Sequence, residues 1–503
     1  MNGGQLVDAR TRGAPAHHKF ITIAERCAGP FYVDCGIGGM SGGWPMSDEF
    51  ANLKPSVLEA LRSRLRGTSL VRGDDGYDIA RRVWNGAIDR HPSCVVGCAD
   101  AEDVSHAMRI AADHGLRMTV RGGGHNVAGR SIRDGSLLLD LSKLRQVSVN
   151  RELRVATVQG GALWRDVDRA TALEELATTG GLISSTGVGG FTLGGGAGWL
   201  MRKHGLACDN LRGAGVVLTD GRFVRASPQE HADLYWGLRG GAGGLGVVTS
   251  FEFQLHPLRE VLAGLVVHPA EHAVEALRTF RDFAAQAPDE FCGVAVIAHA
   301  PPLPFLDPAW HGRPVLMFAM CWCGELAEGE AALAALRGHG RPVVDHVGRM
   351  PYAQWQQIQD PLAPRGHYYY WKTANYAAVS DRTVNDLAAM AFRLPTMRSE
   401  IHLQHMGGAV SRIAAEDSAF AHRNTPFFVN FIGITDAASA VGALREGVRA
   451  LHDEVSHEAL PGILTNFADQ DDSDNIRRFG LQNAGRLEAL RKKYDPGGTL
   501  QNA

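Results

Sequence analysis

The chain has 503 residues, of which 45% are hydrophobic and 21% charged, a composition that excludes a disordered tail or a fibre. Its length predicts two or three domains, or one large domain with an inserted second one. With 51 basic and 54 acidic residues and no long run of one sign, a nucleic-acid surface or an anionic-membrane patch is disfavoured. Because no signal peptide, membrane span or disulfide spacing is evident, we expect a soluble, cytoplasmic protein without a bound metal.

The chain divides into four segments. Residues 1–46 are rich in glycine and lack a secondary-structure period, so we interpret them as an extension of undefined order. A first domain is predicted over 47–258. It begins with a leucine-spaced helix and continues with a strand at 94–98, a helix at 101–115 and a strand at 116–120. A second domain with alternating strand and helix patterns is predicted over 259–459, and residues 460–503 end in an amphipathic helix that returns to the first domain.

Four short patterns suggest functions that their context disfavours. Gly241–Gly246 fits GxGxxG, but a helical pattern precedes it and a strand follows, the reverse of a dinucleotide fingerprint. The GMSGG of residues 39–43 fits a nucleophile elbow, yet Trp-Pro follows where a helix is needed. Cys321 and Cys323 have no second ligand pair nearby, and His402 and His405 point to opposite faces of a strand, so neither pair predicts a metal site.

Two other glycine-rich loops have sequences that favour the binding of an anion. RGGGHN at 121–126 follows a strand, and its glycines let backbone N–H groups approach a pyrophosphate, with Arg121 adding charge. STGVGGFTLGGGAG at 185–198 offers a second set of unhindered N–H groups. No GxxxxGK[ST] is present, which excludes a P-loop NTPase. Taken singly, each loop also fits ordinary structural turns.

The order of the motifs carries more information than any one of them. RGGGHN, GVGGFTLGGGAGWLMRKHGLACDN, DLYWGLRGGAGGLGVVTSFEFQLHP and YDPGG, with YYYWKTAN, HLQHMGGAVSRI and AFAHRNTPF in the second domain, resemble the berberine-bridge-enzyme-like FAD-linked oxidases of the vanillyl-alcohol oxidase superfamily. The resemblance runs from about Asp48 to the end. It implies an α+β fold, with a two-part FAD-binding domain and a substrate domain whose antiparallel sheet is covered by helices.

The resemblance implies FAD bound covalently through His125, the histidine of RGGGH, whose neutral imidazole is a nucleophile. The residues at the family's other cofactor positions are Arg121, Gly122, Gly123, Gly124, Asn126, Thr186, Gly187, Val188, Gly189, Gly190, Asp209, Asn210 and Val248. Members with two covalent links carry a cysteine where this chain has Ile183. Cys208 lies some twenty residues later, so we expect one link only.

The catalytic base departs from the family pattern. The tyrosine that often serves is replaced by Leu464, and at a second position used by some relatives this chain has Met406. Asn466 stays a candidate for hydrogen bonding to the flavin edge. The remaining candidates for the proton acceptor are His402, Gln404 or His405, and one of Tyr368, Tyr369 or Tyr370.

The resemblance therefore implies an oxidase that transfers a hydride from an alcohol or amine carbon of a small molecule, such as a secondary metabolite, to flavin N5, with O2 reoxidising the flavin to give peroxide. The absence of both tyrosines leaves other functions open. They are a dehydrogenase or cyclase with another acceptor, a flavoprotein that sequesters a metabolite, and a protein whose loops serve another nucleotide and which would be colourless. The oligomeric state is not predicted.

Overall fold

The computed structural model describes residues 53–472 and 481–500. The predicted N-terminal extension and its GMSGG motif lie outside these ranges. The leucine-spaced helix is present as α1 (Pro55–Arg64), which begins with proline, a residue suited to the first helical turn because its missing N–H has no intrahelical partner there.

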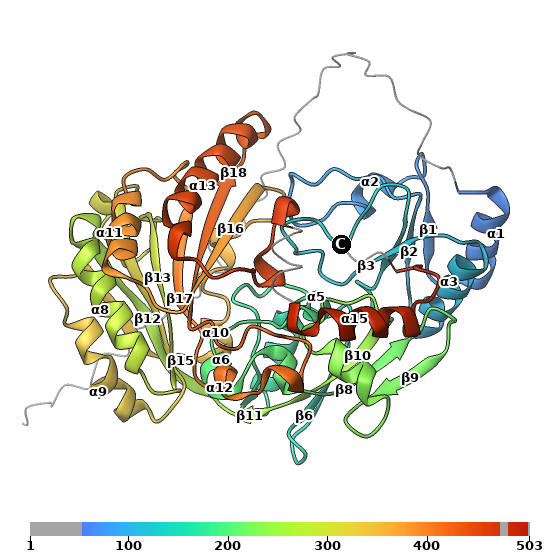
Figure 1. Ribbon diagram of the computed structural model, residues 1–503, viewed down its shortest axis with the longest axis horizontal. Helices are drawn as coiled ribbons and strands as arrows, with labels where there is room; N and C mark the ends of the chain where they lie inside the picture. The colour runs from blue at the N-terminus through green and yellow to red at the C-terminus, as the bar shows by residue number, and fades with distance from the viewer. Residues whose placement is uncertain (1–52, 473–480, 501–503) are drawn as a thin grey trace, which may run out of the picture. The chain divides into compact units, whose positions relative to one another are not determined.

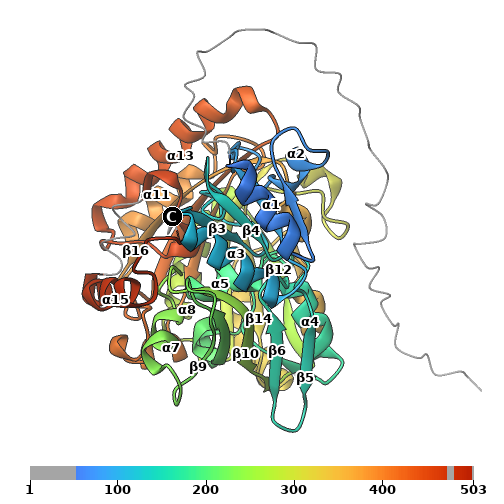
Figure 2. The same ribbon diagram turned by 90° about the vertical axis from the view of Figure 1, so that its right-hand side faces the viewer.

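The first sheet places the loop that contains RGGGHN. Its strand order is β1-β2-β4-β3, and β2, β4 and β3 run parallel. The strands are β1 (Thr68–Leu70), β2 (Cys94–Gly97), β3 (Met118–Arg121) and β4 (Leu137–Asp140). Helix α3 (Ala101–Asp113) connects β2 to β3, which confirms the predicted strand–helix–strand order, and Figure 2 shows α1 and α3 on the outer side of the sheet. Since parallel strands end at one edge, residues 121–126 lie at the carboxyl edge.

The second sheet is antiparallel, with the order β5-β6-β10-β8-β9. Its strands are β5 (Val147–Asn150), β6 (Val155–Gln159), β8 (Leu211–Val217), β9 (Phe223–Ala226) and β10 (Val247–Gln254). Helix α7 (Ala232–Leu238) precedes the glycines of Gly241–Gly246 and β10 follows them, as predicted, so this pattern lacks the context of a dinucleotide fingerprint. A separate two-stranded sheet pairs β7 (Leu176–Ala177), which lies between β6 and β8 in the chain, with β11 (His256–Pro257), which follows β10.

The third sheet has seven antiparallel strands in the order β15-β12-β14-β13-β17-β18-β16. They are β12 (Glu260–Pro269), β13 (Phe291–His299), β14 (Pro314–Trp322), β15 (Val344–Pro351), β16 (Tyr368–Tyr376), β17 (Glu400–His405) and β18 (Phe427–Thr435). One face packs on four amphipathic helices, which are α8 (Ala273–Gln286), α9 (Leu326–Arg337), α11 (Asp381–Met390) and α13 (Val441–Val455). Figure 1 shows α8, α9 and α11 at the outer left and α13 beside β18. This arrangement confirms the predicted α+β class and the antiparallel sheet covered by helices.

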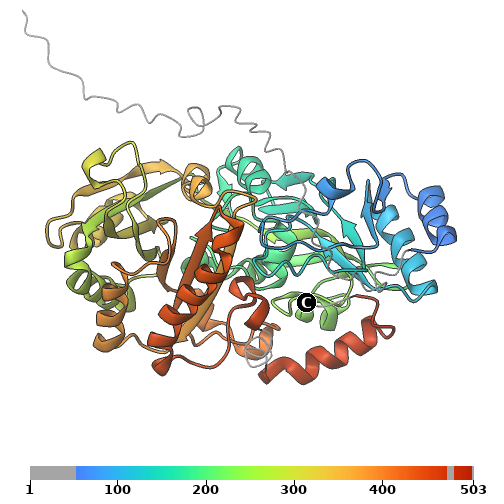
Figure 3. The ribbon, with the colours of Figure 1, turned by 90° about the horizontal axis from the view of Figure 1, so that it is seen from above.

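The opposite face of the third sheet, which we call the inner face, carries Val294, Val296 and Phe428. It packs against Trp199 and Met201 from the glycine-rich half of the chain. In Figure 3 that half, coloured blue to green, lies on the right, and the sheet with its helices lies on the left. The inner face is therefore the surface of the sheet that looks toward the glycine loops.

The last described helix, α15 (Leu481–Tyr494), lies against α7 and the second sheet. Beyond it, the backbone N–H of Met118 donates to the carbonyl of Thr499 at 2.7 Å, and Leu500 forms a parallel bridge with Met118. The C-terminal segment thus lies beside β3. The domain boundaries at residues 258 and 459 stay a prediction.

The two halves also meet where α4 (Trp164–Ala172) contacts α10 (Tyr352–Trp355). Asp168 of α4 is only 5% exposed, and the amide of Gln356 lies 3.4 Å from its carboxylate. Burial raises the pKa of Asp168 to about 8, against the opposing effect of the Gln356 hydrogen bond. The carboxyl group is therefore largely protonated at neutral pH.

We expect Asp168→Asn to stabilise the protein at alkaline pH. Between pH 4 and pH 8 the native carboxyl keeps a proton that the unfolded one has lost, so the wild type loses stability as the pH rises through this window. The substitution removes that loss. The free energy of unfolding of the variant should exceed that of the wild type by more than about 1 kcal/mol at pH 8.5, and by less at pH 5. Denaturant unfolding at both pH values measures it.

The control is Asp166→Asn on the same helix. The Asp166 carboxylate accepts hydrogen bonds from Arg145 at 2.7–2.9 Å, so its loss should destabilise the protein at both pH values. A gain for Asp168→Asn that does not depend on pH would contradict the assignment of a protonated carboxyl group.

Candidate functional site

The loop after β3 presents backbone donors without an internal acceptor. Among the described residues, no hydrogen bond donated by the N–H groups of Gly122, Gly123 or Gly124 is recorded. Gly124 has φ +64°, in the left-handed region that favours glycine, and its carbonyl accepts from the N–H of Trp84 at 2.9 Å. Successive backbone N–H groups without internal acceptors are the kind of donor that binds phosphate oxygens in other proteins.

The second glycine loop touches the first through backbone atoms. A Cβ added to Gly123 would lie 2.5 Å from the nitrogen of Gly187, and one added to Gly187 would lie 2.3 Å from the nitrogen of Gly123. Gly187 precedes the short helix α5 (Val188–Leu193) and bridges to Leu163. Only glycine at both positions permits this approach, so the sequence sets the distance between the two loops.

The rest of the second loop is held by the segment before α4. The carbonyl of Thr186 accepts from the N–H of Trp164 at 3.0 Å, and the N–H of Val188 donates to the carbonyl of Ala162 at 2.9 Å. The Val188 side chain is fully buried in the core of the second sheet. Gly189 and Gly190 follow in α5, and a Cβ added to Gly190 would contact nothing within 4 Å.

His125 lies where the two loops meet the third sheet. Its ring stacks on Trp84 with centroids 4.2 Å apart, and Trp84 stacks in turn on Tyr369 of β16 at 3.8 Å. The Nε2 atom lies 3.2 Å from the Ser185 hydroxyl. Burial, reinforced by the charge of Arg365, lowers the pKa of His125 to about 3, so the imidazole is neutral at pH 7. A neutral imidazole is the nucleophilic form of histidine.

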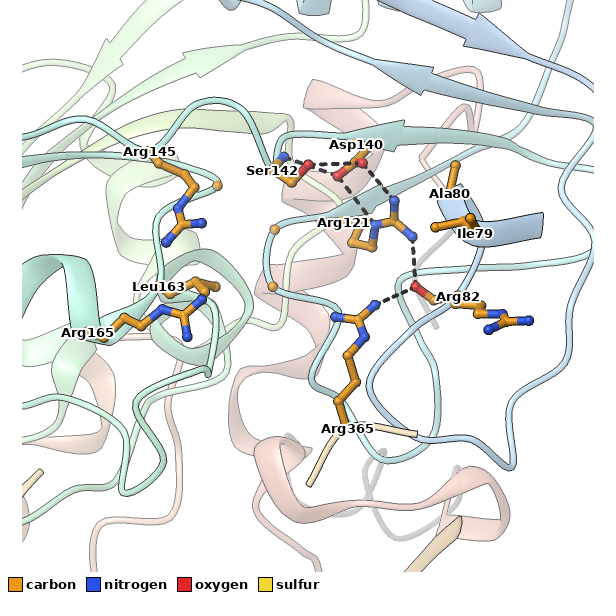
Figure 4. A pocket seen from close by; sticks show the side chains of 13 residues that line it. Ile79, Ala80, Arg82, Arg121, Asp140, Ser142, Arg145, Leu163, Arg165 and Arg365 are labelled. Carbon is orange, nitrogen blue, oxygen red and sulfur yellow. Dashed lines mark hydrogen bonds and ion pairs between the residues drawn. The ribbon is translucent and has the colours of Figure 1, made fainter. Parts of the chain in front are cut away.

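A cationic pocket of about 350 Å³ opens beside the first loop (Figure 4). The residues that line it are Ile79, Ala80, Arg82, Arg121, Gly122, Gly123, Asp140, Ser142, Arg145, Gly161, Leu163, Arg165 and Arg365. Arg121 forms a buried ion pair with Asp140 at 2.7 Å. The charge that the sequence assigned to Arg121 is therefore balanced within the protein, and other arginines supply the net charge of the pocket.

The side chains of three other predicted cofactor residues are engaged internally. Asp209 forms a buried ion pair with Arg423 at 2.7 Å. The Asn210 amide donates to backbone carbonyls of the α6 (Met201–His204) region, and its oxygen lies 2.7 Å from Nε2 of His256. The Asn126 side chain accepts from two backbone N–H groups of its own turn. These side chains shape the loops, which leaves backbone atoms as their means of contacting a ligand.

Val248 and Asn466 affect the site through the backbone segments that they contact. Val248 is buried at the start of β10, and its carbonyl lies so close to Gly160 that a Cβ there would be 2.2 Å away. The Asn466 oxygen accepts from the N–H of Gly196 at 3.1 Å, and its amide donates to the carbonyl of Phe191 at 3.2 Å. Asn466 therefore holds the end of the second glycine loop.

The inner face of β17 brings two of the predicted catalytic residues together. His402 pairs with Asn430 of β18 and Gln404 with Phe428, on the face that looks toward the loops. The His402 ring lies 2.8 Å from the Glu400 carboxylate, Nε2 to Oε2. Gln404 is 2% exposed, and its Nε2 has no hydrogen-bond partner among the described residues. The face thus presents an oriented imidazole and an unsatisfied amide donor.

The other catalytic candidates are engaged elsewhere. His405 lies at the end of β17, where Nδ1 is 2.6 Å from the Arg202 guanidinium, and burial and that charge lower its pKa to about 3. The Tyr369 hydroxyl donates to the Pro364 carbonyl at 2.6 Å, and burial raises its pKa. Tyr370 lies on the helix-covered face, where its hydroxyl bonds to Asp471. Among the described histidines and tyrosines proposed as the base, His402 alone combines the inner face with a carboxylate partner.

Three residues of the site were missed from the sequence. Glu400 stands two positions before His402, a spacing that places both on one face of a strand and that could have been noticed. Trp84 comes from a segment distant from every motif, and Arg365 lies three residues before YYYWKTAN, but no local pattern marks either residue.

Neither a membrane-spanning helix nor a metal-ligand cluster occurs in the described part of the chain. No helix there is long and apolar enough to cross a membrane. No group of three or more His, Cys, Asp or Glu there could hold a metal ion, and Cys321 and Cys323 are buried in the core below the inner face.

Comparisons with known proteins agree with this geometry. Residues 92–227 match the family model described as FAD binding domain. An FAD-linked oxidoreductase of Dictyostelium discoideum is 26% identical over 453 residues, covering 89% of this chain and 96% of the relative. The crystal structure of 6-hydroxy-D-nicotine oxidase from Arthrobacter nicotinovorans is 25% identical, with a TM-score of 0.78, 87% of this chain and 97% of that chain covered.

A second similar structure is that of a protein with covalently linked FAD. Glucooligosaccharide oxidase from Acremonium strictum, which carries a 6-S-cysteinyl, 8α-N1-histidyl FAD, has a TM-score of 0.76 at 23% identity. The match covers 88% of this chain and 97% of that chain. At this identity it shows a common fold.

We expect Gly123→Ala to destabilise the protein by about 1 to 3 kcal/mol, because the added methyl group forces the two glycine loops apart. Denaturant unfolding measures the change. Gly442→Ala in α13, where a Cβ meets nothing within 4 Å, is the control and should be neutral or mildly stabilising. Equal stabilities of the two variants would show that the loop contact is not under steric constraint.

Proposed function

Because the chain belongs to the FAD-linked oxidases of the vanillyl-alcohol oxidase type, we propose that it oxidises an alcohol or amine carbon of a small molecule with covalently bound FAD and O2. The observation that carries the proposal is His125, a neutral imidazole directly after three glycines with free N–H groups and in front of the inner face. When bound, FAD supplies a hydride acceptor at N5 and reacts with O2 to give peroxide.

The glycine loops fit this cofactor. The N–H groups of Gly122, Gly123 and Gly124 lack internal acceptors and would hold the diphosphate, and the second loop approaches them without side chains. We assign the remaining cofactor contacts to backbone atoms of 186–190, 209–210 and 248. Asn466 supports them by fixing the Gly196 backbone.

A single covalent link through His125 follows from the side chains present. Ile183 stands where the relatives with two links have a thiol. Cys208 is fully buried, which raises its pKa well above the usual value, so its thiol is not available as a nucleophile. His125, in contrast, is neutral and next to the Ser185 hydroxyl, which can orient the ring.

His402 is the proposed proton acceptor for the substrate hydroxyl or amine. An acidic partner at Nε2 favours the tautomer with its proton on that nitrogen, which leaves Nδ1 free to accept a proton. Glu400 then stabilises the charged ring, as a carboxylate does behind a catalytic histidine. The pair replaces the missing tyrosines at 464 and 406, and the unsatisfied Gln404 amide offers the substrate a hydrogen-bond donor.

The covalent link is tested by the absorbance spectrum of denatured protein after small molecules are removed. We expect flavin to stay with the wild type and to be released from His125→Ala. His114→Ala, at the exposed end of α3, is the control and should retain it. Release from the wild type would reject the covalent link, and a protein purified without any flavin would reject the oxidase.

The base is tested on a substrate found by oxygen uptake with a panel of alcohols and amines. His402→Asn should slow anaerobic flavin reduction about 10²- to 10⁴-fold without changing the flavin content. Glu400→Gln should slow flavin reduction less, because the imidazole remains and only its orientation and the stabilisation of its charge are weakened. His346→Asn, on edge strand β15 and stacked on Phe305 at 3.9 Å, should match the wild type. Unchanged reduction in His402→Asn would exclude this base.

A further inference from the structure

Residues 84–86 connect the first glycine loop with the third sheet. The backbone N–H of Trp84 donates to the carbonyl of Gly124 at 2.9 Å, and the Trp84 carbonyl accepts from the N–H of Gly366 at 2.9 Å. Gly124 directly precedes His125, and Gly366 lies two residues before β16. This short segment, which belongs to neither glycine motif, is therefore bonded to the loop that carries His125 on one side and to the start of β16 on the other.

The Asn85 side chain makes the same connection with both of its polar atoms. Asn85 is 1% exposed, and its Nδ2 donates to the carbonyl of Val127 at 2.7 Å and to that of Tyr369 at 3.0 Å. Its Oδ1 accepts from the N–H groups of Tyr369 and Ala87, each at 3.0 Å. Because β16 is an edge strand of the third sheet, the Asn85 amide takes the place of a neighbouring strand at Tyr369.

The Trp84 indole fixes the plane of the His125 ring. The two rings are stacked with an interplanar angle of 18°, and the angle between the indole and the Tyr369 ring is 22°. The indole is buried, and its Nε1 donates to the carbonyl of Ala363 at 3.2 Å. A stacked imidazole can turn within its plane but cannot tilt without losing the contact. Trp84 therefore restricts the directions in which His125 can present its ring nitrogens.

We propose that Trp84 and Asn85 are positioning residues that hold the His125 imidazole for formation of its bond to the flavin. The proposal rests on the proposed function, because it concerns the covalent link. In that reaction an imidazole nitrogen bonds to the 8α carbon, while one proton leaves that carbon and one leaves the imidazole. The electron pair so released passes to the flavin and then, with two protons, to O2, which becomes peroxide. Trp84 and Asn85 exchange no proton or electron, and their part is to keep the nucleophile in one orientation.

The test follows link formation in full-length protein that is produced in riboflavin-starved cells and then given FAD. Quenching of FAD fluorescence measures binding, and denaturation at intervals measures the linked fraction. Trp84→Leu should bind FAD with nearly unchanged affinity but form the link about 10²-fold more slowly, the effect of a misplacement of about 1 Å. Trp84→Phe keeps a flat ring for stacking and should restore most of the rate. A general loss of structure would weaken binding and linking together.

The matched control is Trp322→Leu. Trp322 is 3% exposed and its Nε1 also donates to a backbone carbonyl, that of Glu325 at 2.9 Å, but it lies on the helix-covered face of the third sheet. This variant should form the link at the wild-type rate. Asn85→Ala leaves the indole in place but removes the bonds to Val127 and Tyr369, and it should also slow the link.

Two results overturn the proposal alone. They are a Trp84→Leu protein that forms the link at the wild-type rate, and a Trp322→Leu protein that is slowed to the same degree. If Trp84→Leu does not fold, a wild-type rate in Asn85→Ala overturns the proposal instead. Failure of the proposed function is seen in a different protein, because flavin would then leave the denatured wild type itself, and that result would overturn both.

Discussion

The contact between Gly123 and Gly187 is the constraint on which the site depends. The two glycine loops approach so closely that a Cβ added to either residue would lie only 2.3 to 2.5 Å from the backbone nitrogen of the other. Any side chain at either position would separate the first and second sheets at this point. Because the contact is made of backbone alone, it leaves the neighbouring N–H groups exposed and brings His125 to the Ser185 hydroxyl. A region without side chains thus defines the position of His125, the residue that we propose links to the flavin.

In the third sheet, successive side chains of strand β17 point alternately to an apolar side and to a polar side. In β17, Ile401 and Leu403 point into the helix-covered core, while His402 and Gln404 point toward the glycine loops. A shift of one residue would bury the imidazole among leucines and expose the core. The apolar packing of the helices therefore fixes the register that presents the polar groups. Stability and the proposed chemistry rely on the same hydrogen-bonded ladder.

Much of this arrangement could be predicted from local patterns. The strand–helix–strand order before RGGGHN, the reversed context of Gly241–Gly246 and the opposite orientations of His402 and His405 all follow from periods of 2 and 3.6 residues. Asp209 and Asn210 show what a motif cannot predict. A motif gives the position of a residue but not the partner of its side chain, and here the two side chains bond to Arg423 and His256 within the protein. The Arg365 side chain enters its pocket from a loop far along the chain, where no local period gives a signal.

The parallel bridge between Met118 and Leu500 has a consequence for how the protein is made. Strand β3 leads directly into the loop of free N–H groups, and its outer neighbour is supplied by residues from the far end of the described chain. A chain leaves the ribosome from its N-terminus, and its N-terminal parts begin to fold first. During synthesis β3 therefore stays a sheet edge, and it gains this neighbour only after residue 500 has emerged. The edge of the first sheet is therefore completed long after its own four strands, which lie within residues 68–140, have been synthesised.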